Sequence, residues 1–519
     1  MRLTEIRQQR RQKTGSASSS AAIVWALLIA FLLSRGAVAA EVVFDKIYAG
    51  SQSEGIYAFL GVPFAQAARW EPPFPLPDLP QDDIVSATTY PPACMQTNHI
   101  VNWYRELIKD FGGAPESFPA PSMSENCLYL NIWTPTLDNT AALPVVVYLH
   151  GGSNKGGWSF EPNYMGQALA KKGLIVISVN YRLGIFGFFA HPEIPDPNFA
   201  LLDQIAALEW IADKVERVGG NKDNVILMGE SAGASNIDFI LASPRSRGLV
   251  HKAIHQSAGW AINGRVEMLD MQQRALQLTS QLTQDGNDLT QLKTLDAQSV
   301  LEAVKSVYDK VFFDPIPGTP SLPIPAKAAF DNQSITPVDL LIGSNGDEWL
   351  MYLDDEARLE TTLTEWVSES KRERVKALLA GYNEREAMDT LITAANYVCP
   401  SFQIADTVRT QGNNAWFYLF DRIREGDLAS QMGAYHGAEL PYVFDTHDDW
   451  LPTNDIDRRL TQEMMTYWSQ FAKTGNPNTT GLPPWPLFDS ESKRTIRLDK
   501  TIKSTPHPSA ELCSVLLEK

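Results

Sequence analysis

Cysteine is scarce in this chain, and its few cysteines lie far apart. Only four occur among 519 residues, at Cys94, Cys127, Cys399 and Cys513. No two of them form a C-x-x-C pair, which argues against a zinc site or a redox motif, and neither a metal nor another cofactor is expected. An even number of cysteines fits two disulfides in an oxidising compartment, and the spacing alone leaves all three pairings open.

Acidic residues outnumber basic residues in this chain. No apolar run after residue 40 is long enough to cross a membrane. The 44 lysines and arginines face 61 aspartates and glutamates, which gives a formal charge of −17. This balance argues against nucleic acid and anionic membrane surfaces as partners. A solvated acidic surface is the simpler interpretation of the charge, and an acidic cleft for cationic substrates is the alternative.

The first 40 residues have the pattern of a secretory signal peptide. A basic segment precedes an uncharged stretch at residues 21–33, and the small residues AVAA follow at 37–40. We expect cleavage after Ala39 or Ala40 and a secreted or periplasmic protein. Removing six basic residues and one acidic residue moves the formal charge from −17 to −22. The stretch of roughly 13 residues is shorter than the ~20 of a membrane span, so an uncleaved anchor is a minor alternative, as is twin-arginine export at Arg10 and Arg11.

Short apolar runs, often β-branched, alternate with helical patterns after residue 40. Such alternation is typical of the α/β class, in which helices cover both faces of a mostly parallel sheet. Helical spacing of Ile205, Leu208, Ile211 and Val215 indicates one crossover helix. The predicted central strands are at residues 145–149, 174–179, 225–228, 340–342 and 416–420, and shorter strands at 42–48, 57–62 and 128–133 extend the sheet in antiparallel fashion.

No repeat or linker divides residues 41–519, so we expect one domain. A charged, helix-forming stretch at residues 356–396 separates two of the late strands. Insertions at such positions of a doubly wound sheet usually lie over the carboxyl ends of the strands, where a site is found. The stretch is therefore interpreted either as a lid or cleft wall, or as a plain surface insertion.

The motif GESAGA at residues 229–234 indicates a nucleophile elbow, because it directly follows the strand predicted at 225–228. A serine at a sharp turn from strand to helix is held in a strained conformation with its hydroxyl exposed, and only small neighbours permit so close an approach. Gly229 and Gly233 meet that requirement, so Ser231 is the candidate nucleophile. A glycine-rich turn without function is the alternative.

A second glycine-rich segment, HGGSNKGG at residues 150–157, follows the strand predicted at 145–149. Such a loop can direct backbone N–H groups at the oxygen of a carbonyl under attack, and the N–H after the nucleophile adds another donor. We expect Gly152, Ser153 and Ala232 to donate to this oxyanion.

A serine nucleophile also needs a base and a carboxylate that orients the base. Glu348 follows the strand predicted at 340–342, with Asp347 as its neighbouring rival. His436 follows the strand predicted at 416–420 and has glycine nearby on both sides. The order serine, acid, histidine along the chain is the one that α/β-hydrolases use.

The other histidines are interpreted as structural. His150 is expected to support the glycine loop, and His251 and His255 to end a strand. A surface position is expected for His99, His191, His447 and His507.

Together these motifs resemble the type-B carboxylesterases, the cholinesterase-like branch of the α/β-hydrolases. The resemblance covers most of the mature chain: FLGVPF at 59–64, SENCLYLN at 124–131, HGG at 150–152, NYRLG at 180–184, GESAGA at 229–234, DE at 347–348 and FAKTGNP at 471–477. It implies an α/β-hydrolase fold, a large mostly parallel central sheet flanked by helices, with helical insertions over the active-site cleft. It also implies a catalytic triad of Ser231, Glu348 and His436.

The resemblance further implies two disulfides, Cys94 with Cys127 and Cys399 with Cys513. It implies two structural ion pairs, Arg69 with Glu125 and Arg182 with Asp203. Two positions depart from the family pattern. Ser153 replaces the third glycine of the oxyanion loop, and Trp349 stands where glycine commonly follows the acid, which suggests a bulkier wall beside Glu348.

The expected function is hydrolysis of a small-molecule ester by an exported serine carboxylesterase, through an acyl-enzyme. The alternatives are a catalytically inactive relative that binds adhesion partners and a lipase that acts at an oil interface. Four tryptophans could line the cleft or lie in the core: Trp103, Trp158, Trp260 and Trp349. The sequence indicates neither the ester nor the oligomeric state.

Overall fold

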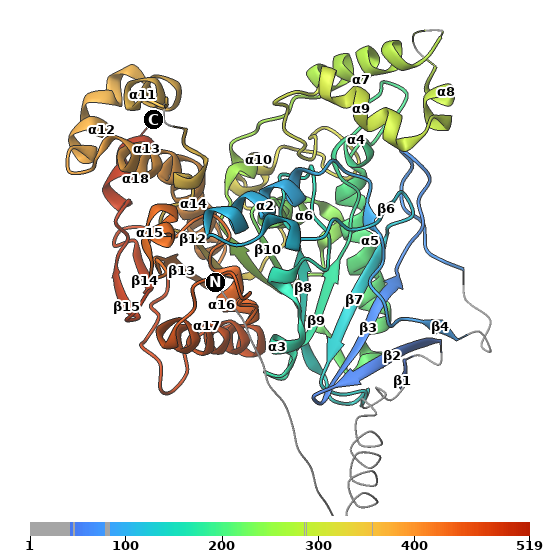
Figure 1. Cartoon of the computed structure of the whole chain (residues 1–519), viewed down its shortest axis with the longest axis horizontal. Helices are drawn as coiled ribbons and strands as arrows, with labels where there is room; N and C mark the ends of the chain where they lie inside the picture. Colours follow the sequence, from blue (N-terminus) through green and yellow to red (C-terminus); the bar gives the residue numbers. More distant parts are fainter. Residues whose placement is uncertain are drawn as a thin grey trace, which may run out of the picture. The chain divides into compact units, whose positions relative to one another are not determined.

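The β-branched runs form the centre of a large mixed sheet (Figure 1). The computed structural model describes residues 42–44, 47–77, 84–284, 286, 288–354 and 356–518. The signal peptide predicted at residues 1–40 lies outside the described residues, and residues 41–519 form one compact unit. Within the described part, the order of strands is β1-β2-β3-β7-β9-β8-β10-β11-β12-β13-β14-β15, with β4 beside β2.

The middle of the sheet is parallel, and both of its ends are antiparallel. Parallel pairing runs from β9 through β8, β10, β11, β12 and β13 to β14. A second, two-stranded sheet pairs β5 (Ala93–Cys94) with β6 (Met123–Ser124). The strands of the large sheet are β1 (Val42–Phe44), β2 (Tyr48–Ser53), β3 (Ile56–Pro63), β4 (Val85–Ser86), β7 (Tyr129–Thr134), β8 (Leu143–Leu149), β9 (Ile175–Val179), β10 (Gly220–Glu230), β11 (Lys252–Gln256), β12 (Asp339–Asn345), β13 (Ala415–Phe420), β14 (Arg494–Leu498) and β15 (Lys503–Pro506). The five predicted central strands are thus confirmed as β8, β9, β10, β12 and β13.

The predicted strand at residues 42–48 is wrong, because the chain turns back on itself there. Phe44 of β1 pairs with Tyr48 of β2 in antiparallel register, so the segment is a hairpin. Asp45 and Lys46 interrupt the apolar run in the sequence, and polar residues between two short apolar runs favour a turn.

The sheet has a hydrophobic core on each face, because successive side chains of a strand point to opposite sides. Along β8, Val145 and Val147 belong to one core, and Val146 and Tyr148 belong to the other. All four side chains are buried, which explains why this strand is a continuous apolar run in the sequence.

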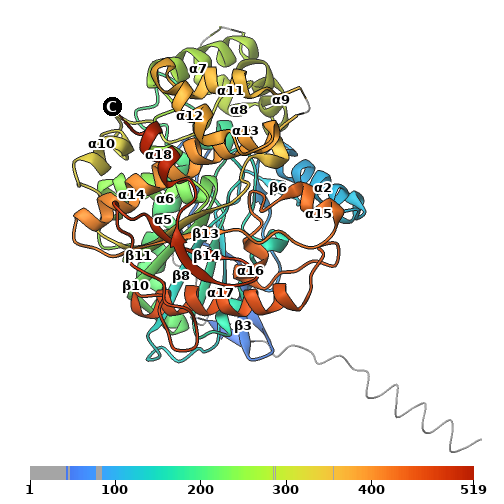
Figure 2. The same ribbon diagram turned by 90° about the vertical axis from the view of Figure 1, so that its left-hand side faces the viewer.

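Helices cover both cores (Figures 1 and 2). Helices α5 and α6 pack on one face, and α3, α16 and α17 pack on the other. The helices are α2 (His99–Asp110), α3 (Gln167–Ala170), α4 (Gly184–Gly187), α5 (Phe199–Lys214), α6 (Ala232–Ala242), α7 (Met268–Leu282), α8 (Leu289–Thr294), α9 (Ala297–Val307), α10 (Ala326–Asp331), α11 (Leu359–Trp366), α12 (Arg372–Leu379), α13 (Glu384–Thr393), α14 (Cys399–Thr410), α15 (Asp427–Met432), α16 (Leu440–Phe444), α17 (Asp455–Thr474) and α18 (Ala510–Leu516).

Two expectations about helices are confirmed. The predicted crossover helix is α5, and its Ile205, Leu208 and Ile211 are buried against the sheet. The charged stretch at residues 356–396 contains α11, α12 and α13. In the described part of the chain, no helix has the length and apolarity that crossing a membrane requires.

Both disulfides that the family resemblance implies are present in the structure. Cys94 is bonded to Cys127, which is 33 residues away in the sequence. Cys399, the first residue of α14, is bonded to Cys513 in α18, which is 114 residues away. The second bond therefore fastens the last helix of the chain to the body of the protein.

The double substitution Cys399→Ala and Cys513→Ala should destabilise the protein. Loss of a native crosslink that closes so long a loop costs about 2–5 kcal/mol, because the unfolded chain regains conformational freedom. Urea unfolding followed by circular dichroism should show a clearly lower midpoint. Ser514→Ala, an exposed neighbour in α18, is the control and should leave the midpoint in place; equal midpoints for both variants would contradict the expectation.

Candidate active site

The strand-to-helix turn at Ser231 has the geometry of an elbow. Strand β10 ends at Glu230, α6 begins at Ala232, and Ser231 between them has φ +55° and ψ −125°. A positive φ is strained for a residue other than glycine and is common where a structure holds a functional side chain in place. A Cβ atom on Gly233 would lie 2.0 Å from the carbonyl oxygen of Leu149, and one on Gly229 would lie 2.6 Å from the backbone of Gly233. The two glycines are therefore required by close packing.

Short contacts join the three candidate catalytic side chains. The Oγ of Ser231 lies 2.8 Å from Nε2 of His436, and Nδ1 of His436 lies 2.6 Å from Oε2 of Glu348. With the proton on Nδ1, the imidazole donates to Glu348 and accepts from the serine hydroxyl. The three residues follow β10, β12 and β13 in the chain, and these strands lie in one parallel sheet.

Glu348 is positioned by burial and by the backbone of the preceding strand. Its carboxylate is fully buried, and Oε1 accepts the N–H of Asn345 at 2.7 Å. The rival carboxylate, Asp347, instead accepts the N–H of Ala434 at 2.7 Å. The structure thus brings Glu348, and not its neighbour, to the imidazole.

The glycine loop that follows β8 lines the same cavity as Ser231. Gly152, Ser153 and Ala232 line one cavity together with Ser231. Gly152 has φ +104°, and a Cβ there would lie 2.2 Å from the carbonyl oxygen of Gly156, so only glycine fits. Ala232 is the first residue of α6, where a backbone N–H has no partner within the helix. These positions fit the expected oxyanion donors.

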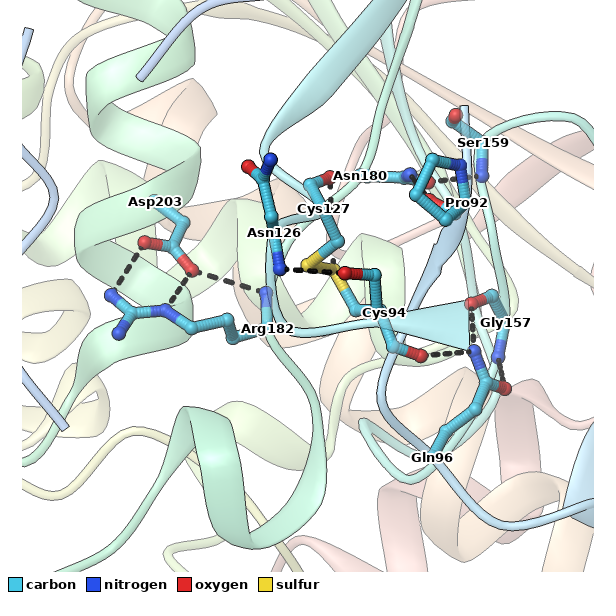
Figure 3. Close-up of a disulfide and its surroundings, with 11 residues drawn as sticks. Pro92, Cys94, Gln96, Asn126, Cys127, Gly157, Ser159, Asn180, Arg182 and Asp203 are labelled. Atoms are coloured by element: carbon cyan, nitrogen blue, oxygen red, sulfur yellow. Dashed lines mark hydrogen bonds and ion pairs between the residues drawn. A yellow bond between two sulfur atoms is a disulfide. The ribbon is translucent and has the colours of Figure 1, made fainter. Parts of the chain in front are cut away.

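The first disulfide holds this loop through Gln96 (Figure 3). The buried Gln96 side chain donates from Nε2 to the carbonyl oxygens of Gly157 and Cys94, at 2.8 and 3.1 Å, and its Oε1 accepts the N–H of Gly157 at 2.8 Å. Both polar groups of the last loop glycine are therefore satisfied by one amide side chain. Sequence reasoning missed Gln96, because nothing around it in the sequence indicates a contact with a residue 61 positions away.

The two ion pairs implied by the resemblance are present. Arg182 donates from Nε and Nη2 to the two oxygens of the buried Asp203, at 2.8 and 2.7 Å (Figure 3). Arg69 binds both oxygens of Glu125, at 2.8 and 2.5 Å. Sequence reasoning missed a third pair, in which the fully buried Arg422 donates to Asp457 at 2.8 Å.

His150 supports the glycine loop, as expected. Its ring stacks on Tyr181 with centroids 4.4 Å apart, and Nδ1 lies 2.9 Å from the carbonyl oxygen of Gly151. Burial lowers the pKa of His150 to about 4, so the ring is neutral near pH 7.

Two of the histidines expected at the surface are buried. His191 and His507 are only 1% and 3% exposed, and their Nδ1 atoms accept the backbone N–H of Glu193 and Ser509. A histidine two residues before a backbone N–H can satisfy it locally, and the surrounding sequence does not reveal this use. Burial lowers the pKa of His507 to about 3.

A model of the carboxylesterase family matches residues 46–515. The chain belongs to the carboxylesterase family. It is a carboxylic ester hydrolase with the α/β-hydrolase fold.

Two relatives and two solved structures illustrate the similarity. The para-nitrobenzyl esterase of Bacillus subtilis (strain 168) is 29% identical over 487 residues, which cover 89% of this chain and 95% of that protein. The acetylcholinesterase of Bungarus fasciatus is 30% identical over 523 residues, which cover 88% of this chain and 82% of that protein. A solved PNB esterase has a TM-score of 0.78 at 28% identity, covering 91% of this chain and 98% of the other. A carboxylesterase of Geobacillus stearothermophilus has a TM-score of 0.77 at 25% identity, covering 90% and 98%.

Ser231 and His436 open into a cavity of about 560 Å³ with an aromatic lining. Trp103, Trp260 and Trp349 line it, whereas Trp158 is buried in a separate cluster and belongs to the core. Trp349, which directly follows the buried Glu348, forms a bulky part of the cavity wall, as expected. Among the described residues, no group of three or more His, Cys, Asp or Glu side chains could hold a metal ion.

The helical insertion contributes to the cavity. Trp366 from the end of α11 lines it, as do Asn396 and Tyr397 just beyond α13. Of the two interpretations of residues 356–396, these positions support the cleft wall.

Two buried carboxylates near the imidazole were missed from the sequence. Oε1 of Glu230 lies 3.4 Å from Nε2 of His436. Glu439, three residues after the histidine and directly before α16, accepts hydrogen bonds from Asn345 Nδ2 at 2.7 Å and from Gln256 Nε2 at 2.9 Å. Burial raises the pKa of both Glu230 and Glu439. Burial lowers the pKa of His436, but the charge of Glu230 and the hydrogen bond to Glu348 outweigh it, and the pKa is raised overall.

Gln96→Ala should reduce ester hydrolysis without unfolding the protein. The substitution leaves the N–H and carbonyl of Gly157 without their partner, so the glycine loop is held less firmly. We expect kcat to fall about 10- to 100-fold, since removing an oxyanion donor outright costs ~10²- to 10³-fold. The measurement is steady-state kinetics on a p-nitrophenyl ester.

Gln66→Ala, which removes an exposed glutamine, is the matched control and should keep its kcat. A thermal unfolding curve for each variant separates a loosened loop from a misfolded chain. Wild-type kcat in Gln96→Ala would show that the loop does not depend on this side chain.

Proposed function

We propose that this family member is a serine carboxylesterase that works through an acyl-enzyme. Ser231 is the nucleophile, His436 the general base and acid, and Glu348 the carboxylate that orients the imidazole. The observation that carries the proposal is the pair of contacts at 2.8 and 2.6 Å that links these three side chains beside the cavity.

In the first half of the reaction, the serine attacks the ester. His436 takes the proton of the Ser231 hydroxyl at Nε2 as Oγ bonds to the ester carbonyl carbon. The fully buried Glu348 stabilises the imidazolium that forms. Backbone N–H groups of Gly152, Ser153 and Ala232 hold the negative oxygen. The alcohol then leaves with the proton from Nε2.

In the second half, water replaces the alcohol. His436 takes a proton from water, the hydroxide attacks the acyl carbon, and the same N–H groups hold the second oxyanion. Collapse of this intermediate releases the acid and returns the proton to Ser231. Atoms and charges balance without a cofactor.

Where the protein works is a further part of the proposal. We infer that residues 1–40 are a cleaved signal peptide and that residues 41–519 are the exported enzyme. The sequence pattern and the two disulfides support this, because disulfides persist in oxidising compartments. Its substrate is a small-molecule ester.

Ser231→Ala should abolish turnover, because no other hydroxyl of the described residues is hydrogen bonded to Nε2 of His436. We expect kcat on a short p-nitrophenyl ester to fall by about 10⁴-fold or more. A fluorophosphonate probe should label the wild-type protein once and leave the variant unlabelled.

The matched control is Ser235→Ala, one turn along α6, whose buried hydroxyl has no hydrogen-bond partner among the described residues. It should keep both activity and labelling. Undiminished hydrolysis by Ser231→Ala would overturn the mechanism, and a folded wild-type protein that the probe does not label would favour the inactive, partner-binding alternative.

Glu230→Gln should extend activity to lower pH. The carboxylate of Glu230 raises the pKa of His436, and only the neutral imidazole can take the serine proton. Without that negative charge, the imidazole stays neutral at lower pH, so the acidic limb of the kcat/KM profile should move to lower pH.

A pH profile of kcat/KM between pH 5 and 10 gives the test. Glu209→Gln, which removes a surface carboxylate bound to Arg245, is the control and should leave the limb in place. An acidic limb that moves to higher pH in Glu230→Gln would contradict the effect assigned to the charge of Glu230.

A further inference from the structure

One arginine faces the aromatic cavity that contains Ser231. Among the described residues that line the cavity, Arg265 is the only lysine or arginine. The mechanism proposed above does not use it. Its side chain is 24% exposed, so the guanidinium is accessible from the cavity.

The guanidinium of Arg265 lies over two aromatic rings. Its Cζ lies 3.8 Å from the ring centroid of Phe312 and 4.9 Å from that of Trp260. Such stacking holds a guanidinium plane in one orientation and leaves the N–H groups at its edges available for hydrogen bonds.

Asp314 occupies only one edge of this guanidinium. Its Oδ2 accepts from Nε at 3.1 Å and from Nη2 at 3.0 Å. A guanidinium has five N–H donors, so the second N–H of Nη2 and both of Nη1 remain. No hydrogen bond between described residues uses them. The free edge, Nη1 with Nη2, is a planar fork that matches the two oxygens of a carboxylate.

Aromatic contacts connect Arg265 to the reacting residues. Trp260 belongs to the same buried cluster as Ala232, and its ring meets that of Tyr397 edge to face at 5.7 Å. The ring of Tyr397 lies 5.4 Å from that of His436. A substrate whose ester group lies at Ser231 can therefore extend along these rings towards Arg265.

The other acids of the cavity do not cancel this charge. Burial raises the pKa of Glu161 to about 7, so this acid carries only part of a negative charge near neutral pH, and Glu230 lies beside His436, with its Oε1 3.4 Å from Nε2. Asp314 is the carboxylate bound to Arg265 itself.

We propose that Arg265 binds a carboxylate carried by the substrate, so that the natural substrates are esters with a second, anionic group. The inference rests on the proposed function, since it places the reacting ester at Ser231. Half-esters of dicarboxylic acids belong to this class, as do hydroxy acids and phenolic acids that are acylated on the hydroxyl and keep a free carboxylate.

Two matched pairs of esters test the proposal. One pair is p-nitrophenyl hydrogen adipate and p-nitrophenyl hexanoate, which differ by a carboxylate on the acyl half. The other is 4-carboxyphenyl hexanoate and 4-methylphenyl hexanoate, which differ on the alcohol half. The readout is the ratio of kcat/KM for the anionic ester to that for its neutral partner, measured by pH-stat with spontaneous hydrolysis subtracted.

Arg265→Gln should lower this ratio about tenfold or more in at least one pair, mainly through KM, since a hydrogen bond between charged groups is lost. Asp314→Asn should raise the ratio in the same pair, because the amide still accepts from Arg265 while the competing negative charge is gone. A merely structural ion pair would not produce opposite changes. Arg245→Gln, at an exposed arginine paired with Glu209, is the control and should leave both ratios unchanged.

The outcomes separate this proposal from the one on which it rests. Hydrolysis of the neutral esters that requires Ser231, combined with ratios that neither Arg265→Gln nor Asp314→Asn changes, would overturn the anionic subsite and leave the esterase mechanism standing. If Arg265→Gln misfolds, the ratio in Asp314→Asn decides, and a ratio at or below the wild-type value would overturn the proposal. A wild-type protein that hydrolyses none of these esters would instead overturn the proposed function.

Discussion

The close approach of α6 to the ends of β8 and β10 is the constraint on which the whole site depends. Gly229 and Gly233 leave no space for a Cβ atom, so the helix begins directly against the sheet and Ser231 must take a strained conformation. The same contact places the first N–H of the helix beside the glycine loop that follows β8. This one packing requirement thus positions the Ser231 hydroxyl and the N–H groups expected to hold the oxyanion. Because β12 is parallel to β8 and β10, the loop that follows it lies at the same edge of the sheet.

Around this frame, the site concentrates carboxyl groups at a single imidazole. Glu348 is hydrogen bonded to His436, Glu230 lies within 3.4 Å of it, and Glu439 is held close by Asn345 and Gln256. Acids buried so close together cannot all ionise, and burial raises the pKa of the two that do not bind the imidazole. The arrangement favours positive charge on His436, which is the charge that this residue would gain in the proposed attack by Ser231.

The sequence predicted the parallel centre of the sheet, which the structure confirms, and it indicated Ser231, Glu348 and His436 as candidates, which the structure brings into contact; both follow from local patterns. Strands that are buried on both faces appear in the sequence as apolar runs, and the elbow requires glycines at fixed spacing around Ser231. Residues that act across long sequence distances were missed. The side chains of Gln96 and Arg265 reach partners 61 and 49 residues away, and no local pattern marks such contacts. His191 and His507 were placed at the surface because their neighbours are polar, whereas tertiary packing buries them.

Through the side-chain amide of Gln96, the first disulfide affects the candidate active site as well as the stability of the protein. Gln96 lies two residues from Cys94 and holds both polar groups of Gly157, so the crosslink that closes this segment also fixes the end of the glycine loop. In a chain with reduced cysteines, Ser231, His436 and Glu348 would remain on their own elements, but the end of the glycine loop would be held less firmly. Formation of this disulfide and the shape of the glycine loop beside Ser231 are therefore coupled.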